Sequence, residues 1–509
     1  MKTITILFLI SVYAFTAPAQ TASPLAQGVQ FYKQNDYANA ALRFHKAMNA
    51  KGLTAEQVTQ ANYFLGLSLY NLKLYQASSY PMIKVMRSDS KKYKQKAMEK
   101  LIAISNRLGD QHILDYVMSK MQVAELEQLA VDVYYYKLGV VSYEKLALDD
   151  SIKYLNQSVA KNPKNEPALN LLGLIYLKKS EAKKAIETYT KLSALYEGKS
   201  NSNIKKGYTT LNLARAYYQD RNFEEAARFY RRISKDNSAY RESLTELGWT
   251  YLQQSRVRSA LSAIQTLHTP FYENFFEPES LVLRAILLNY MCQFDEAEKA
   301  VKSFNENYES TLNFLNNWTG QTVTVAKAIA EINYATEFLK SENGDAPVDL
   351  NQYKGQIPFK VTRSILKDSR MKNLYDTYIL IRDESRLAKK YMGNSKNGLG
   401  LFLDKIYVGR QNYYKSELAT KFNDVILSLE KNITYYNQQI KFVYYEILEA
   451  KKSQLRLKIG STPKPTINEE QNRNFYVKNG YRYWPFEGEF WLDEVGNYQY
   501  LGVNRCEQE

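Results

Sequence analysis

The chain is poor in the residues from which most catalytic and metal centres are built. Its 509 residues include 3 histidines and 2 cysteines. Zinc sites need about four clustered nitrogen or sulfur ligands. His45, His112 and His268 each stand alone in the sequence, with no other His or Cys at ligand spacing. We therefore expect three structural histidines, no metal site and no cofactor.

The common sequence signatures of catalysis are also missing. There is no G-x-S-x-G, no G-x-x-x-x-G-K-[ST], no H-E-x-x-H and no C-x-x-C. Gly398-Leu399-Gly400 lacks the third glycine and the preceding strand of a phosphate-binding turn, so we interpret it as part of a loop between two helices. These absences favour a protein that is not an enzyme.

No segment approaches 18 consecutive apolar residues, the length that would indicate a membrane-spanning helix. The longest apolar stretch, Ile4 to Phe15, follows Lys2 and precedes Ala17-Pro18-Ala19. A positive start, a short apolar centre and a small-x-small site are the parts of a secretory signal. Residues 1–19 are therefore predicted to be a signal peptide. The mature chain is expected to be exported to the periplasm, with the cell surface or medium as the alternative.

Two cysteines are too few for a fold held together by disulfides, even in an oxidising compartment. We expect Cys292 to be a buried free thiol, and a single bridge between Cys292 and Cys506 is the alternative.

The charge balance is basic. Lys and Arg total 68 against 53 for Asp and Glu, a formal net charge of +15. Such a surface attracts acidic partners, which outside the cytoplasm means envelope proteins, an anionic glycan or a membrane surface. The basic residues are spread along the chain and alternate with acids instead of forming one dense patch, so nucleic acid is not expected as a partner.

One spacing recurs between residue 24 and residue 309. A small residue is followed by an aromatic residue or leucine three positions on, by alanine or serine twelve on, and by a bulky residue sixteen on. Gly139 and Gly173 are 34 residues apart, as are Ala214 and Gly248, and this period is typical of two-helix repeats. The small residues that anchor the units are Gly28, Gly66, Gly139, Gly173, Ala214, Gly248 and Ala285.

These units resemble the tetratricopeptide repeat family, whose pattern is Leu-Gly-x-x-Tyr, then Ala, then an aromatic residue, then Ala, then Pro. The matching residues in one unit are Leu172-Gly173, Tyr176, Ala185, Tyr189 and Leu192, and in others Leu138-Gly139, Ser151, Leu155, Ser158 and Pro163, or Leu247-Gly248, Tyr251, Ala260, Ile264 and Leu267. We expect Gly173 to meet Ala185 where the two helices of its unit pack. The resemblance implies an all-α solenoid over residues 24–309. Generic packing of antiparallel helices would also place small residues at close contacts.

The resemblance weakens in two places. In the unit of Gly66, Ser78 and Met82 replace the usual alanine and aromatic residue. Residues 88–130 have a helical composition but match poorly, so they are a degenerate repeat or an insertion.

Beyond the repeats we predict a helical extension over residues 310–341, a linker over 342–358, and a long helical hairpin over 359–459. The helices of the hairpin are predicted at 361–392 and 399–459, and Gly409 is a candidate break in the second. Residues 418–447 carry a heptad seam with one stutter. We expect the seam to pack on the preceding helix of the same chain, with coiling against a second chain as the alternative, so the oligomeric state is left open.

The C-terminus is predicted to be a flexible linker over residues 460–474 and an aromatic, acidic tail over 475–509, which forms short strands or a docking arm. The tail residues singled out for docking are Trp484, Phe486, Glu487, Glu489 and Trp491. The tail is similar to the Trp-Pro-Phe-x-Gly-Glu tails of secreted repeat proteins of gliding or predatory bacteria, which implies a role in envelope assembly or motility. The alternative function is binding or processing of carbohydrate, with tryptophan stacking on sugar beside paired carboxylates.

In tetratricopeptide arrays the first helix of each unit lines a concave groove that holds a partner segment. By register, this resemblance implies the groove residues Asn170, Lys178, Tyr208, Arg215, Tyr218, Gln219, Trp249 and Gln253. Packing between repeats is the alternative for each aromatic residue. Leu174 and Leu211 stand where some members of the family carry polar residues that clamp a carboxylate, so that activity is not expected. The predicted function is a non-catalytic adaptor between proteins of the cell envelope.

Overall fold

The computed structural model describes residues 23–198, 203–318, 323–341, 350–392, 398–459 and 490–506. Over these ranges the fold is all-α, with 21 α-helices and no strand. The predicted signal peptide, the linker over 460–474 and residues 475–489 of the tail lie outside the described residues, as do residues 342–349. None of the helices in the described ranges is both long enough and apolar enough to cross a membrane.

The helices follow one another in the order α1 (Pro24–Lys33), α2 (Tyr37–Met48), α3 (Ala55–Asn71), α4 (Tyr75–Met86), α5 (Lys91–Leu108), α6 (His112–Met118), α7 (Val123–Leu129), α8 (Val131–Glu144), α9 (Leu148–Lys161), α10 (Glu166–Lys178), α11 (Ala182–Ala194), α12 (Asn203–Gln219), α13 (Phe223–Tyr230), α14 (Tyr240–Gln253), α15 (Val257–Gln265), α16 (Pro278–Tyr290), α17 (Phe294–Trp318), α18 (Val325–Ser341), α19 (Phe359–Lys367), α20 (Ser369–Met392) and α21 (Leu399–Ile459). Four short 3-10 segments are η2 (Thr266–His268), η3 (Pro270–Tyr272), η4 (Leu350–Gln352) and η5 (Leu492–Glu494). The chain divides into two compact units: unit 1 comprises Met1–Lys120 and Thr377–Gln411, and unit 2 comprises Met121–Asp376 and Asn412–Glu509.

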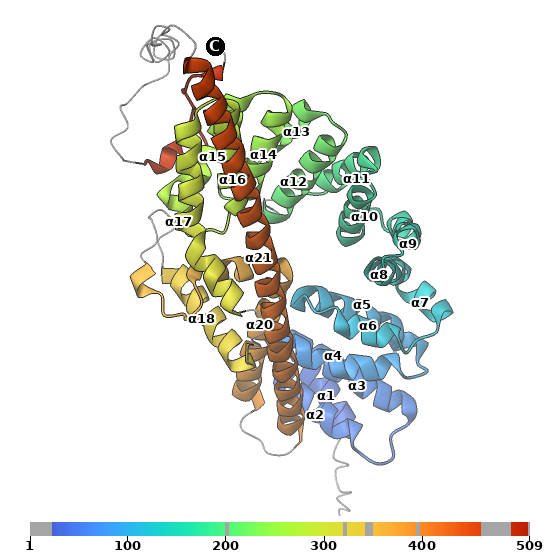
Figure 1. Cartoon of the computed structure of the whole chain (residues 1–509). Coiled ribbons are helices and arrows are strands. Elements are labelled where there is room, and N and C mark those ends of the chain that lie inside the picture. The colour runs from blue at the N-terminus through green and yellow to red at the C-terminus, as the bar shows by residue number, and fades with distance from the viewer. Residues whose placement is uncertain are drawn as a thin grey trace, which may run out of the picture. The chain divides into compact units, whose positions relative to one another are not determined.

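Seven helix hairpins repeat along the chain: α1–α2 and α3–α4 in unit 1, and α8–α9, α10–α11, α12–α13, α14–α15 and α16–α17 in unit 2 (Figure 1). Where the anchor is glycine, the first helix of a hairpin meets the second at the bulky residue sixteen positions later. A Cβ on Gly173 would lie 2.7 Å from the ring of Tyr189, and one on Gly28 would lie 2.7 Å from the ring of Phe44. The spacing of sixteen is therefore a physical contact. The atoms nearest to such a Cβ on Gly173 belong to the fully buried Tyr189, and Ala185 of the same hairpin is buried as well.

The turn inside each hairpin also repeats. The residue seven positions after each small anchor has a positive φ, between 52° and 63°. This left-handed conformation reverses the chain after the first helix and is unfavourable for residues with a Cβ. The residues that adopt it are Asn35, Lys73, Leu146, Ser180, Arg221, Ser255 and Cys292.

Serine at the twelfth position is a variant of the same packing. Ser78 Oγ donates to the carbonyl oxygen of Gly66 at 2.7 Å, and Ser151 Oγ donates to that of Gly139 at 2.7 Å. Met82 takes the place of the usual aromatic residue against Gly66. The hairpin of Gly66 therefore keeps the geometry of the other hairpins although Ser78 and Met82 replace the usual residues. Residues 88–130 form three further helices, α5 to α7.

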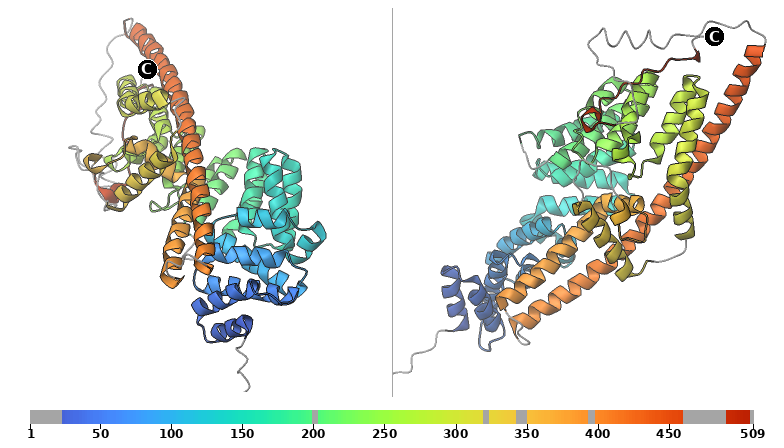
Figure 2. Two further views of the ribbon diagram at one scale, coloured as in Figure 1. Left: turned by 90° about the horizontal axis from the view of Figure 1, so that it is seen from below. Right: turned by 90° about the vertical axis from the view of Figure 1, so that its left-hand side faces the viewer.

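The long C-terminal helices differ from the prediction in two respects. The first is divided at Asp368 into α19 and α20, and the second runs unbroken through Gly409 as a helix of 61 residues. Nothing lies within 4 Å of a Cβ built on Gly409, so this glycine is an open position on the helix. In unit 1, the end of α20 and the start of α21 lie side by side as an antiparallel pair, the orange helices of Figure 2. The last repeat helix α17 continues past residue 309 to Trp318.

The heptad seam of α21 is buried within the chain. Leu418, Phe422, Ile433, Ile440 and Ile447 are all at most 1% exposed. In unit 2, polar contacts fix this half of the helix: Lys451 Nζ lies 2.8 Å from a carboxylate oxygen of Asp295 on α17, and Asn423 accepts from the backbone N–H of Val323 at 3.0 Å.

Residues 490–506 form an arm along the last two repeats, without a strand in this described part of the tail. The backbone N–H of Tyr500 donates to Ser262 Oγ, and that of Gly496 to Thr266 Oγ1, each at 2.9 Å. Cys506 forms a disulfide with Cys292. The expectation of a free Cys292 was therefore wrong, because the arm folds back and brings Cys506 to the turn between α16 and α17.

Candidate partner-binding groove

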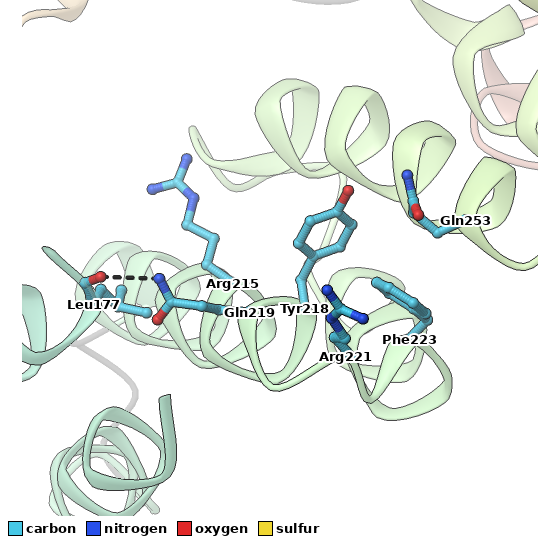
Figure 3. Close-up of a pocket in the computed structure, with 7 residues that line it drawn as sticks. All are labelled: Leu177, Arg215, Tyr218, Gln219, Arg221, Phe223 and Gln253. Carbon is cyan, nitrogen blue, oxygen red and sulfur yellow. Dashed lines mark hydrogen bonds between the residues drawn. The ribbon is translucent and has the colours of Figure 1, made fainter. Parts of the chain in front are cut away.

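A cavity of about 700 Å³ opens between the first helices of three successive repeats in unit 2, α10, α12 and α14. Figure 3 shows its lining, which combines aromatic, cationic and amide side chains over the ends of these helices. The lining residues are Leu177, Arg215, Tyr218, Gln219, Arg221, Phe223 and Gln253.

Four of the eight predicted groove residues meet in this cavity. Arg215, Tyr218 and Gln219 project from α12, and Gln253 is the last residue of α14. Asn170, Lys178, Tyr208 and Trp249 are not part of its lining. The predicted residues therefore lie on the helices that form the cavity. Of the eight, however, only those in the C-terminal halves of α12 and α14 line it.

Arg215 is the centre of an ionic cluster between α12 and α14. Its Nη2 lies 2.6 Å from Glu242 and 2.5 Å from Glu246, its Nε donates to Glu246 at 3.0 Å, and its Nη1 donates to Asn212 Oδ1 at 3.1 Å. Burial disfavours the charge, but the hydrogen bonds and charges of Glu246 and Glu242 outweigh it and raise the pKa of Arg215. The guanidinium thus joins two repeats, and most of its donors are already used.

Glu246 also accepts a hydrogen bond from Tyr230 Oη at 2.8 Å. Burial and the Glu246 carboxylate raise the pKa of the Tyr230 hydroxyl, and the same two causes raise that of Tyr218 at the cavity wall. Both tyrosines are therefore neutral hydrogen-bonding groups at physiological pH. The cluster offers a polar wall of fixed geometry beside the aromatic side chains.

Gln219 connects α12 to the preceding repeat. Its Nε2 donates to the carbonyl oxygen of Leu177 at 3.0 Å, a bond drawn as the dashed line in Figure 3. This carbonyl lies in the last turn of α10 and also accepts the backbone N–H of Ser180 at 3.0 Å. Gln219 therefore stabilises the wall, and its amide oxygen is the part that remains for a ligand.

Arg221 and Phe223 belong to the cavity but were missed by the sequence prediction. Arg221 is the positive-φ residue of its hairpin, and Phe223 begins α13. Arg221 is exposed, and its side chain makes no ion pair within the ranges that the structure describes. The sequence signal for both residues is the turn of the hairpin, because Arg221 follows the small anchor Ala214 by seven residues and Phe223 follows it by nine.

The other predicted groove residues have partners of their own or lie outside the cavity. Trp249 Nε1 donates to Glu279 on α16 at 2.8 Å, so this aromatic residue links neighbouring repeats. Lys178 Nζ lies 5.4 Å from the ring centroid of Tyr143. Asn170 is exposed and Tyr208 is half-buried. A charged or polar pair about thirty positions apart is a sequence signal for such links, because neighbouring first helices are one repeat apart.

The tail residues are mostly not described. Trp484, Phe486, Glu487 and Glu489 lie outside the described residues, while Trp491 is 60% exposed. Among the residues that the structure describes, no group of three or more His, Cys, Asp and Glu side chains is arranged to hold a metal ion.

Comparison with known proteins identifies the repeat. Residues 211–268, which run from within α12 to the end of η2, match the tetratricopeptide repeat family model. A search of curated proteins finds none with significant sequence similarity. Among solved structures, the chain is similar to a tetratricopeptide repeat protein from Parabacteroides merdae, with 13% identity over 56% of this chain and 92% of the other and a TM-score of 0.27. It is also similar to a Rap protein complexed with competence and sporulation factor, with 11% identity over 77% of this chain and 99% of the other and a TM-score of 0.28.

Proposed function

Because residues 211–268 match the tetratricopeptide repeat family and the same hairpin geometry recurs along the chain, we propose that the protein is an interaction scaffold whose groove along α10, α12 and α14 holds a segment of a partner protein. The observation that carries this proposal is the cavity of about 700 Å³ between these helices. Tandem helical repeats present such surfaces to extended or helical segments of other proteins.

The chemistry of the lining favours a segment with an apolar or aromatic anchor. Tyr218, Phe223 and Leu177 provide apolar contact area, and tyrosine and arginine are among the usual anchors of protein interfaces. Arg221 and Gln253 add polar groups at exposed positions. Since Arg215 is paired with two carboxylates, Arg221 is the better cation for an acidic residue of the partner.

We further propose that the protein is exported and works in a complex of the cell envelope, in its assembly or in motility. The signal-like N-terminus supports export, and so does the Cys292–Cys506 disulfide, since such bonds persist in oxidising compartments. The net charge of +15 favours acidic partners in that compartment.

The groove is tested by crosslinking in cells with a photoreactive amino acid placed at Gln253. The matched control carries it at Lys191, an exposed residue on α11, the second helix of its hairpin. We expect one envelope protein to be captured from Gln253 and not from Lys191, and Tyr218→Ala to reduce the yield at least fivefold. Equal capture from both positions, or a yield unaffected by Tyr218→Ala, would show that this groove is not the working surface.

A further inference from the structure

A second cavity, of about 290 Å³, lies in unit 2 near the last repeat and is separate from the groove. Its walls come from the segment between α15 and α16, from α16, α17 and α19, and from the arm at Phe490. Three basic side chains contribute to the lining: His268, Arg284 and Lys360.

Arg284 is largely buried and is not paired with a carboxylate. Within the described parts of the chain it makes no ion pair, and its guanidinium hydrogen bond is from Nη1 to His268 Nδ1 at 3.0 Å. Burial lowers the pKa of Arg284, only partly opposed by the more distant Tyr500 and Glu296. A buried guanidinium is costly unless an anion or several acceptors compensate it.

The hydrogen bonds around His268 fix the direction of this guanidinium. Arginine has no lone pair to share, so Nδ1 of His268 must be the acceptor and Nε2 must carry the proton. That Nε2 lies 3.1 Å from Ser280 Oγ, which in turn donates to the carbonyl oxygen of Glu277 at 2.8 Å. Burial and the charge of Arg284 keep the pKa of His268 well below its ordinary value, so the imidazole stays neutral. One chain of donors therefore orients Arg284 and leaves its other N–H groups for a ligand.

Lys360 is the second cation of the cavity. Its Nζ lies 4.6 Å from the ring centroid of Tyr308 and donates to the carbonyl oxygen of Asn307 at 3.3 Å. Within the described residues it makes no ion pair, and burial lowers its pKa against the opposing charge of Glu273. The ammonium is therefore held in place by neutral groups.

Two carboxylates, Glu273 and Glu277, line the cavity, and within the described residues neither forms an ion pair with Arg284 or Lys360. Glu277 pairs with Arg241 at 3.2 Å and with Lys367 at 3.6 Å, on other elements of unit 2. Arg284 and Lys360 therefore lie beside aromatic walls without a carboxylate in ion-pair contact among the described residues, which is the environment of an anion site.

From this arrangement we infer that the cavity binds a small oxyanion, a carboxylate or phosphate group, between Arg284 and Lys360. Guanidinium matches the paired oxygens of either group, and an ammonium adds a second charge-assisted hydrogen bond. The aromatic walls of Tyr272, Phe275 and Tyr308 fit an apolar body attached to the anion.

Titration calorimetry on the full-length protein tests the inference with two probes, benzoate and inorganic phosphate, at constant ionic strength set with chloride. We expect saturable binding of at least one probe. Whether benzoate or phosphate binds more tightly tells whether the natural ligand carries a carboxylate or a phosphate group. Arg284→Met and Lys360→Met should each weaken that binding at least tenfold, since a hydrogen bond to a charged group is worth about that much.

Lys302→Met is the control, because Lys302 is exposed on α17 and its ion pair is with Glu306. It removes the same charge from the same region and should leave binding unchanged. Circular dichroism establishes that each variant is folded; if Arg284→Met is not, Lys360→Met decides. Absence of saturable binding of both probes, or equal loss in Lys302→Met, would overturn the site.

His268 is a positioning residue in this scheme. His268→Gln keeps one acceptor for Arg284 and one donor for Ser280, whereas His268→Leu keeps neither. We expect Gln to retain most of the affinity and Leu to lose at least tenfold. Equal affinity in both variants would contradict the positioning role. Crosslinking from Gln253 is measured independently, so failure of this site and failure of the groove are distinguishable.

Discussion

The carboxyl group of Glu384 on α20 accepts the backbone N–H of Gln76 at the start of α4, at 2.9 Å, across 308 residues of sequence. Its other oxygen accepts the N–H of Tyr75 at 3.0 Å. Leu74 at the N-cap of α4 provides no side-chain hydrogen bond, so the first turn would otherwise leave donors unsatisfied. Glu384 thus serves as a cap supplied by a distant helix of the same unit.

This cap predicts a pH-dependent stability. Burial raises the pKa of Glu384 to about 8 from an ordinary value of 4.5, although the N–H groups of Gln76 and Tyr75 oppose the shift. Between these two pH values the folded state holds a proton that the unfolded state has released. The stabilisation is therefore full below pH 4.5 and is lost as pH rises to 8, by roughly 3–5 kcal/mol.

Urea unfolding of the full-length protein at pH 5, 6, 7 and 8 measures this slope. Glu384→Gln mimics the protonated side chain and should flatten the dependence, while Asp383→Asn, on the exposed face of the same helix, should not. A slope that is the same in wild type and Glu384→Gln would refute the assignment.

Much of the repeat architecture could be predicted, because its rules are local. The small anchor and the bulky residue sixteen positions later belong to one hairpin, and Gly173 with Tyr189 shows that the spacing encodes a contact. The same holds for the all-α fold class and for the helices that form the groove. The left-handed residue at the seventh position was not recognised, since Lys73 and Arg221 carry no turn signature.

Features formed by distant segments could not be predicted. From the sequence, Glu384 would be assigned to the exposed face of a helix. Only the folded unit shows that it caps α4. Cys292 and Cys506 are separated by 214 residues, and no periodicity relates the arm to the seventh repeat. The cavity at Arg284 likewise combines elements from residues 267 to 490, so its basic side chains appear unrelated in the sequence.

Substitutions at Gly173 and Gly409 should have opposite effects on stability, because Tyr189 crowds Gly173 whereas the space around Gly409 is open. Gly173→Ala would place a Cβ 2.7 Å from a fully buried ring and should destabilise unit 2 by about 1–3 kcal/mol. Gly409→Ala should stabilise α21 by about 0.5–1 kcal/mol, because the position is helical and open. Chemical unfolding followed by circular dichroism measures both. Destabilisation of similar size in both variants would mean that steric contact is not the cause.

Leu146 predicts a stabilising substitution. It adopts φ of 60° and is 70% exposed, so the fold gains little from its apolar side chain while the backbone is strained. Asparagine tolerates this conformation better, and Leu146→Asn should raise the free energy of unfolding by roughly 0.5–1 kcal/mol. Leu146→Ala is the control, because it removes the side chain and keeps the strain. If both variants gain equally in differential scanning calorimetry, the strain is not what asparagine relieves.

The disulfide predicts how firmly the arm is held. Its reduction frees Cys506, while the bonds from Gly496 to Thr266 and from Tyr500 to Ser262 remain as the contacts of residues 495–506 with α15 and η2. Since a bridge that closes a long loop typically contributes about 2–5 kcal/mol, Cys506→Ser should lower the stability of unit 2 by that order. Hydrogen exchange should then show faster opening of residues 495–506 than of the helices beneath.

Reductant provides the matched control for this variant. It should destabilise the wild type to the level of Cys506→Ser and leave Cys506→Ser itself unchanged, because the two treatments remove the same bond. Cys506 is the better position for substitution, since Cys292 holds a positive φ of 52° in its turn and a change there alters the backbone as well. A wild type whose exchange rates do not respond to reductant would contradict a structural role for the bridge, and the arm would then be held by its hydrogen bonds alone.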